Sequence, residues 1–297
     1  MVAMVNLNKL KRMLQSSAKS KRGRKAKPKA IYVSKKTEAF YLSQLLAIVK
    51  TCKQEIELQL LPVIRQHTVS DSKSIQVSDG ILDIFLRVLS LVRSQLDGLV
   101  DSVAIDLAQR VIQQSKDATD KQLALLIYNA TGIDVTGLLT AEDLVETLNE
   151  ALAANVSLIK SIPKQYLDKV EQIVMLGLQT GQRAEQMVAK IQELHPISKN
   201  RAALVARDQV GKITSRLTQV RQQKMGITHY TWSTSQDERV RDSHRNRNGK
   251  LFAWSDPPDD GHPGMPIRCR CVAIPYTAHL FNADAPSPDD LMKSQSE

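Results

Sequence analysis

The sequence predicts an α+β fold that is predominantly α-helical and ends in a small C-terminal β-containing module. Aromatic residues make up only 4% of the chain, which favours helices built on Leu, Ile, Val and Ala. Short extended segments separated by turn-forming residues appear only after Gly226. With 297 residues, the chain has room for two compact domains.

The first half of the chain predicts helices and no catalytic motif. Apolar residues at helical spacing predict a helix over residues 37–61 that Pro62 ends. A long helix over residues 78–115, bent near Gly98, and a shorter one over 120–129 follow. Thr140 with Asp143 indicates an N-terminal cap for a helix over 141–162. We therefore expect a helical domain over residues 37–154.

Three more helices are predicted before the extended segments. Pro163 suits the first position of a helix that ends near Gly181, and a helix over residues 183–194 stops before Pro196. A helix capped by Ser198 then runs to Lys224. Its apolar residues recur every three or four positions and form a stripe that we interpret as core-facing: Ala203, Ala206, Val210, Ile213, Leu217 and Val220.

The C-terminal segments predict three strands, over residues 228–233, 250–254 and 268–276. Turn-forming residues separate them. Residues 277–297 predict a flexible tail.

The positive charge of the chain is concentrated in one N-terminal arm. The net charge is +10, yet residues 1–37 hold 12 of the 41 basic residues and no acidic ones, which leaves 29 basic against 31 acidic residues elsewhere. We expect residues 1–36 to be disordered alone and to bind double-stranded DNA without sequence specificity; a solubilising tail is the alternative. The candidate DNA-binding residues are Lys19, Lys21, Arg22, Arg24, Lys25, Lys27 and Lys29.

No membrane segment, signal peptide or disulfide framework is expected. No run of residues approaches the roughly 18 consecutive apolar residues of a membrane helix. The N-terminus lacks the pattern of a signal peptide, in which a charged region is followed by an apolar region and a cleavage site. The three cysteines are an odd number and do not suit a disulfide framework. We expect the chain to mature in the cytoplasm and to have no membrane partner.

Two cysteines and two histidines predict a candidate zinc site. On a strand, Cys269 and Cys271 point to the same face, and His244 and His262 complete a set of four ligands of the kinds that zinc prefers. The alternative is that both cysteines are small buried residues and both histidines bond to loop backbone. A disulfide between Cys269 and Cys271 is disfavoured because its ring is too small for normal geometry.

Acidic and basic residues alternate before His244. Asp237, Glu238 and Asp242 lie among arginines, and we expect such pairs as Asp242 with Arg268 or Arg270 to hold the module together. The alternative is a metal-dependent nuclease or hydrolase centred on the four candidate ligands, with Asp242 and Asn248 beside them. No adjacent Asp–His pair or paired-carboxylate motif is present, so we do not expect an enzyme.

A series of motif residues is spread over the C-terminal segments: Trp232, Asp237, Arg239, Arg241, Asp242, His244, Gly249, Phe252, Gly261, His262, Pro263, Gly264, Cys269, Arg270, Cys271 and Pro275. With these residues, the order of residues over 155–276 resembles the minor head, or head-morphogenesis, proteins of tailed bacteriophages, of the Mu F-like type. The resemblance divides this domain into helices over 155–225 and a small β module over 226–276. One departure is Asp208, where a small hydroxyl residue is expected.

The resemblance implies a minor capsid protein of the virion, present in few copies and associated with the portal. Its implied partners are the portal protein, the major capsid or scaffolding protein and packaged DNA. It would act in procapsid assembly and, in some relatives, in DNA packaging or ejection. The implied location is the capsid interior, after assembly in the host cytoplasm. A sequence-specific DNA-binding protein is the weakest alternative because no recognition-helix motif is visible.

Overall fold

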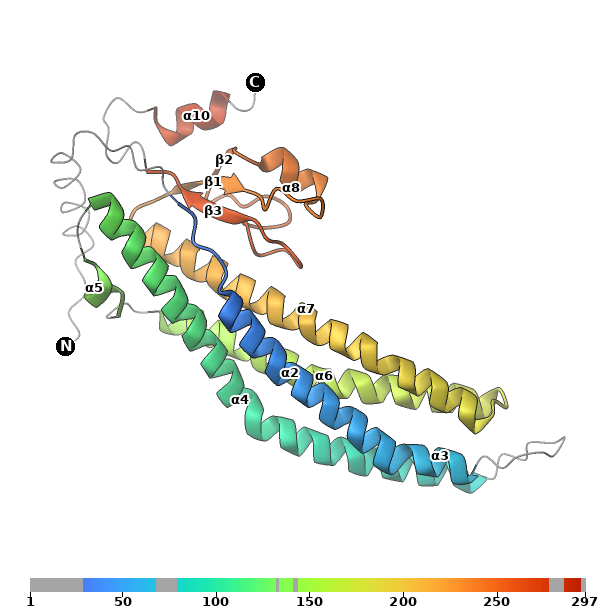
Figure 1. Ribbon diagram of the computed structural model, residues 1–297. Coiled ribbons are helices and arrows are strands. Elements are labelled where there is room, and N and C mark those ends of the chain that lie inside the picture. The colour runs from blue at the N-terminus through green and yellow to red at the C-terminus, as the bar shows by residue number, and fades with distance from the viewer. Residues whose placement is uncertain (1–28, 68–78, 132–133, 141–143, 278–285, 295–297) are drawn as a thin grey trace. The chain divides into compact units, whose positions relative to one another are not determined.

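A computed structural model describes residues 29–67, 79–131, 134–140, 144–277 and 286–294 (Figure 1). It is predominantly helical with a small antiparallel sheet near the C-terminus, which confirms the predicted α+β class. The elements are α2 (Lys35–Glu55), the π-helix η1 (Ile56–Leu60), α3 (Leu61–His67), α4 (Asp79–Thr131), α5 (Thr136–Thr140), α6 (Val145–Gln179), α7 (Ala184–Lys224), β1 (His229–Ser233), α8 (Asp242–Arg247), β2 (Leu251–Ala253), β3 (Val272–Pro275) and α10 (Pro288–Ser294).

The helix ends predicted at prolines are wrong. Pro163 lies inside α6 and Pro196 inside α7. An interior proline costs about 3 kcal/mol, but burial of a large aliphatic side chain contributes roughly 1.5–3 kcal/mol, and both Ile159 and Ile162 are buried beside Pro163. Tertiary packing therefore outweighs the missing hydrogen bond.

The predicted stop at Pro62 is wrong for a different local reason. The helix widens into the π-turn η1 just before this proline, where the Leu61 N–H donates to the Ile56 carbonyl. Because the wider turn changes the hydrogen-bond register, the helix continues past Pro62 as α3, which is described over Leu61–His67.

The predicted break between residues 115 and 120 is also wrong, since α4 is a single helix. The Thr119 hydroxyl donates to the Ser115 carbonyl at 2.7 Å, and Lys116 pairs with Asp120 at 2.7 Å. Asp120 also pairs with Arg221 of α7, whose side chain is 2% exposed. The polar residues at the predicted break therefore continue α4, and Asp120 links it to α7.

The chain folds into two compact units that alternate along the sequence. Unit 1 contains the described residues of Met1–Thr37, Ile112–Ala151 and Asp208–Glu297, and unit 2 contains those of Glu38–Val111 and Leu152–Arg207. This division differs from the consecutive domains 37–154 and 155–276 predicted above. The reason is that α4, α6 and α7 each contribute residues to both units.

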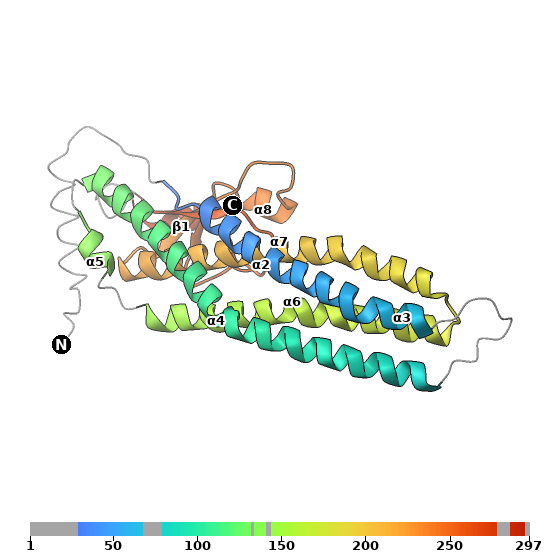
Figure 2. The ribbon, with the colours of Figure 1, turned by 60° about the horizontal axis from the view of Figure 1, so that its bottom comes forward.

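Unit 2 is built from helical segments alone. Its parts of α2–α3, α4, α6 and α7 run alongside one another (Figures 1 and 2). Arg93 of α4 pairs with Asp168 and Glu171 of α6 at 2.7 and 2.6 Å. Buried apolar residues on these helices form the core of unit 2, among them Leu45, Phe85, Leu96, Val170 and Met187. No helix in the described part of the chain has the length and apolarity needed to cross a membrane.

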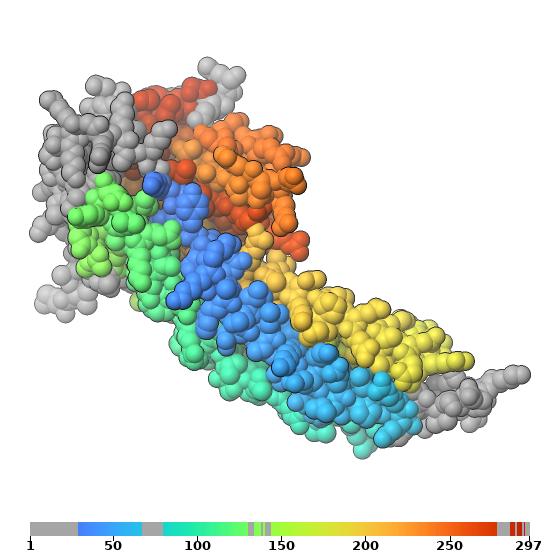
Figure 3. Space-filling model, in the orientation of Figure 1, coloured from blue at the N-terminus to red at the C-terminus, as the bar shows by residue number. Residues whose placement is uncertain are grey.

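Unit 1 contains the sheet, whose strand order is β2-β1-β3 with antiparallel pairing throughout. Tyr230 of β1 lies opposite Phe252 of β2 and Pro275 of β3. Tyr230 and Trp232 face the same side and are fully buried, as the period of two along a strand requires. We call residues 226–277 the sheet module; in Figure 3 its orange to red atoms form one packed body.

A second hydrophobic core of unit 1 forms where the first described residues pack against α4. Ile31 packs with Leu123 and Ile127 of α4, and Met225 packs against the same cluster. The Gln122 side chain accepts from the Tyr32 backbone N–H at 2.9 Å and donates to the Tyr32 carbonyl at 2.8 Å. The residues that directly follow the basic arm are therefore fixed to α4.

We predict that Asp120→Asn lowers the free energy of unfolding by about 3 kcal/mol, because it removes the negative charge that pairs with the buried Arg221 guanidinium. Chemical denaturation measures this change. Asp106→Asn is the matched control, since Asp106 also forms an i,i+4 pair on α4, with Arg110, but both members of that pair are exposed. It should change stability little. Equal effects of the two variants would contradict a special role for the buried pair.

Candidate metal centre

His244 is placed by α8 and by the sheet. It lies in the middle of this short helix, which follows an extended residue at Arg241. Its side chain is 3% exposed, and its ring meets that of Trp232 edge to face with 5.1 Å between centroids. The orientation of the imidazole is therefore set by packing.

Residues 261–271, which we call the cysteine loop, are fixed to α7. The Ser215 hydroxyl donates to the Pro263 carbonyl, and Asp208 accepts from the Arg268 backbone N–H at 3.0 Å. Gly264 has a φ of +86°, and a Cβ on it would lie 3.0 Å from the Ser215 Cβ. Glycine is therefore needed there both for its backbone conformation and for the close approach to α7.

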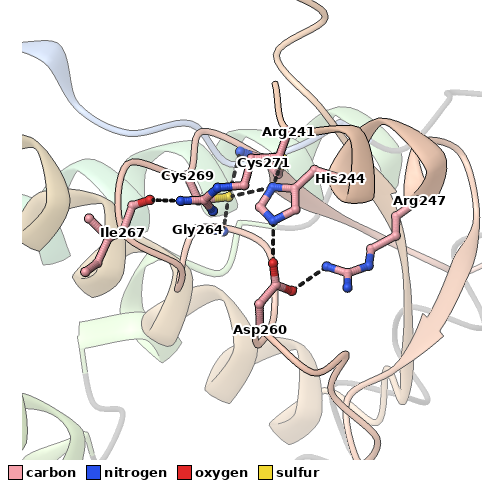
Figure 4. A network of polar contacts seen from close by, with 8 residues as sticks. All are labelled: Arg241, His244, Arg247, Asp260, Gly264, Ile267, Cys269 and Cys271. Atoms are coloured by element: carbon pink, nitrogen blue, oxygen red, sulfur yellow. Dashed lines mark hydrogen bonds and ion pairs between the residues drawn. The ribbon is translucent and has the colours of Figure 1, made fainter. Parts of the chain in front are cut away.

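The loop brings both thiols to His244 (Figure 4). The Nδ1 atom of His244 lies 3.6 Å from the Cys269 Sγ and 3.4 Å from the Cys271 Sγ, and the three atoms are all within 4.8 Å of one another. The backbone N–H groups of Gly264 and Cys271 both donate to the Cys269 Sγ at 3.4 Å. These two donors favour a thiolate at Cys269.

A hydrogen bond between the two thiols shifts their pKa values in opposite directions. A hydrogen bond from Cys271 lowers the pKa of Cys269, with help from the two backbone donors and against the effect of burial. The same contact raises the pKa of Cys271, and burial adds to that increase. In the metal-free protein, Cys269 is therefore the first of the pair to ionise.

Asp260 holds the far side of the His244 ring. Its carboxylate lies 2.7 Å from His244 Nε2 and also pairs with Arg247. Burial opposes ionisation of Asp260, but the contacts with His244 and Arg247 outweigh it and lower its pKa. An ionised carboxylate only accepts hydrogen bonds, so Nε2 carries a proton, and Nδ1 is the ring nitrogen that faces the thiols.

The distances fit a tetrahedral ion. With Zn–S bonds of about 2.3 Å and Zn–N bonds of about 2.0–2.1 Å, a tetrahedral angle separates a sulfur from a nitrogen ligand by roughly 3.5 Å. The two Nδ1–Sγ distances lie close to this value. An aspartate on the second nitrogen of a histidine ligand is also a common support in zinc sites.

The structure does not bring His262 into this cluster. The His262 Nδ1 lies 2.9 Å from the Tyr230 hydroxyl, and its ring packs edge-on against Tyr230 and Trp254. Burial lowers the pKa of His262 and so favours the neutral ring. His262 therefore forms part of the aromatic core of the sheet module, instead of serving as the fourth ligand predicted from the sequence.

The premise that placed both thiols on a strand is wrong. The strand β3 begins at Val272, so Cys269 and Cys271 precede it in irregular backbone. Arg268 has a φ of +61°, a turn conformation that a continuous strand excludes. The two thiols nevertheless converge because backbone hydrogen bonds and α7 fix the loop.

The predicted pairing of acidic and basic residues occurs with different partners. Arg270 forms a two-pronged pair with Asp237, whose pKa this contact lowers. Asp242, predicted to reach Arg268 or Arg270, pairs with Arg245 on α8 at 2.8 Å and is 91% exposed. The residues named for a nuclease centre are therefore not assembled, since Asp242 and His262 both lie outside the His244 cluster.

The remaining motif residues shape the turn that leads back to the sheet. Gly249 has a φ of +80° and its N–H donates to the Trp232 carbonyl at 2.8 Å. The exposed Arg239 donates its backbone N–H to Asp237 at 3.0 Å.

The candidate DNA-binding residues lie outside the described part of the chain, with the exception of Lys29, which is exposed.

Sequence reasoning missed three supports of the site. Asp260 stands beside a second acid, Asp259, in a run of turn-forming residues, and nothing in that pattern distinguishes them. Asp208, noted above only as a departure from the family pattern, binds the cysteine loop and pairs with Lys212 at 2.9 Å. Ser215 carried no signal, because it is one of many small polar residues along a helix.

Comparisons with known proteins agree with the resemblance seen in the sequence. A family model described as "Phage Mu protein F like protein" matches residues 168–274. A protein of Haemophilus influenzae (strain ATCC 51907 / DSM 11121 / KW20 / Rd), named "Uncharacterized protein", is 34% identical over 259 residues. The aligned region covers 86% of this chain but 57% of that relative's length. No solved structure gives a significant match.

We predict that Gly264→Ala disrupts the centre more than Gly249→Ala does. Both glycines have a positive φ, which costs alanine about 1 kcal/mol, but only Gly264 faces a neighbour within 3.4 Å. The overpacking against Ser215 should cost a further 1–3 kcal/mol or so, measured by chemical denaturation of the metal-free protein. If both variants lose the same stability, the loop does not depend on close contact with α7.

Proposed function

We propose that this chain is a minor head protein of a tailed bacteriophage that acts in head morphogenesis and associates with the portal during procapsid assembly. The observation that carries the proposal is the family match over residues 168–274. That region includes the cysteine loop, both of its anchors on α7, and all three residues of the His244 cluster. The similarity thus extends over the part of the molecule with the most specific geometry.

The same proposal includes a zinc ion in the sheet module. The ligand types, their separation and the support of His244 by Asp260 agree with zinc. A bound zinc would stabilise the folded module, because the unfolded chain does not hold the three ligands together. Its role would therefore be to keep an assembly module closed.

Incorporation into heads tests the assembly role. We expect the chain to be present in procapsids and virions of its own phage, and to co-purify with that phage's portal protein, as measured by mass spectrometry. Replacement of Cys269 and Cys271 by Ala should reduce incorporation strongly, whereas Cys52→Ala, which changes a buried cysteine of unit 2, should reduce it little. Absence of the wild-type chain from procapsids would refute the proposal.

DNA binding by the N-terminal arm is the second part of the proposed role. The arm has a dense run of basic residues without acids, which suits neutralisation of phosphates by counterion release. The contacts of Ile31 and Tyr32 with α4 fix the chain at the point where the arm joins unit 1. The arm would thus tether DNA to a defined place on the folded protein.

We expect the full chain to bind random duplex DNA with an affinity that falls steeply as salt rises. Substitution of Gln at Lys19, Lys21, Arg22, Arg24, Lys25, Lys27 and Lys29 should remove most of this binding. A control in which the five lysines among these residues become Arg keeps the charge and should bind like the wild type. Fluorescence anisotropy over a salt series measures both, and unchanged binding by the Gln variant would exclude the arm as the DNA contact.

A further inference from the structure

The three residues of the His244 cluster leave one position of a tetrahedral ion unfilled. Structural zinc sites have four protein ligands, whereas sites with three protein ligands keep the fourth position for water or another small molecule. Whether this site is structural or open therefore depends on whether a fourth side chain reaches the ion.

The nearby polar side chains are engaged elsewhere. Asp260 binds Nε2 of His244, on the opposite edge of the ring from Nδ1, and pairs with Arg247. His262 is held by the Tyr230 hydroxyl. Over the described ranges of the chain, no other His, Cys, Asp or Glu joins His244, Cys269 and Cys271 as a close group.

Burial around the cluster is uneven. His244 and Cys271 are buried, while Cys269 is partly exposed. Arg241 is also exposed and donates to the Ile267 carbonyl of the cysteine loop at 2.7 Å. The solvent-facing side of the centre therefore lies toward Cys269, next to a cationic side chain that favours an anion.

We propose that the centre holds zinc through three protein ligands and keeps its fourth position, on the Cys269 side, for an exchangeable water or small anion. This inference rests on the zinc binding proposed above and adds that the coordination sphere is open. An open position gives the centre a ligand-binding capacity that a purely structural zinc site lacks.

Cobalt(II) substitution of the full chain tests the open position, with azide as the probe. Tetrahedral cobalt bound by two thiolates is coloured, and entry of azide changes its visible absorption bands. We expect a saturable shift of these bands on azide titration, with one cobalt per chain retained by elemental analysis. A cobalt spectrum that does not respond to azide would overturn the open position alone, whereas failure to take up cobalt or zinc would overturn the zinc proposal itself.

Two variants and one direct measurement exclude a hidden fourth ligand. His262→Gln and His279→Gln should leave the cobalt spectrum and its azide response unchanged; His279 lies outside the described residues. A changed spectrum in either variant would identify that histidine as the fourth ligand and overturn the proposal. X-ray absorption of the wild-type zinc protein should give two sulfur neighbours and the outer-shell scattering of one imidazole ring. The scattering of two imidazole rings would overturn the proposal without any variant.

Discussion

The docking of the cysteine loop onto α7 is the contact on which the candidate centre depends. The loop has no strand partners at Cys269 or Cys271, so the sheet does not fix the positions of their sulfurs. Asp208 and Ser215 supply this constraint from two points on α7. They lie seven residues apart, about 10 Å along one helix face, so a single rigid element sets the shape of the loop.

The sheet module is small, and its stability comes from several kinds of contact. An isolated small sheet is marginally stable in water and needs packing against a helix. Here Tyr230, Trp232 and Trp254 form an aromatic core, and the Trp254 indole donates to Gln222 of α7 at 3.0 Å. The Asp237–Arg270 pair adds a polar link across the module. A metal ion bound by His244 and the two cysteines would add a further link between α8 and the loop that precedes β3.

The sequence predicted the fold class and the presence of three strands well because hydrophobic periodicity and turn residues are local signals. The third strand begins at Val272, four residues later than predicted. It placed helix ends at Pro163 and Pro196 wrongly because tertiary packing, which overrides the local cost of proline, depends on distant partners. It placed an end at Pro62 wrongly because the π-turn before this proline has no clear sequence signal. For the site, residue types identified His244, Cys269 and Cys271 as a possible set. They also suggested His262, and only the fold reveals that its ring belongs to the aromatic core. Asp260 and Ser215 were out of reach because their roles exist only after the loops and α7 meet.

The alternation of the two units along the chain has a consequence for synthesis on the ribosome. All residues of unit 2 have been synthesised once Arg207 has been added, whereas unit 1 needs Asp208–Glu297 as well. Until then, Asp120 of α4 has no Arg221 to pair with, and Leu123 and Ile127 lack Met225. Unit 2 can therefore fold during translation, before the residues that complete unit 1 have been synthesised.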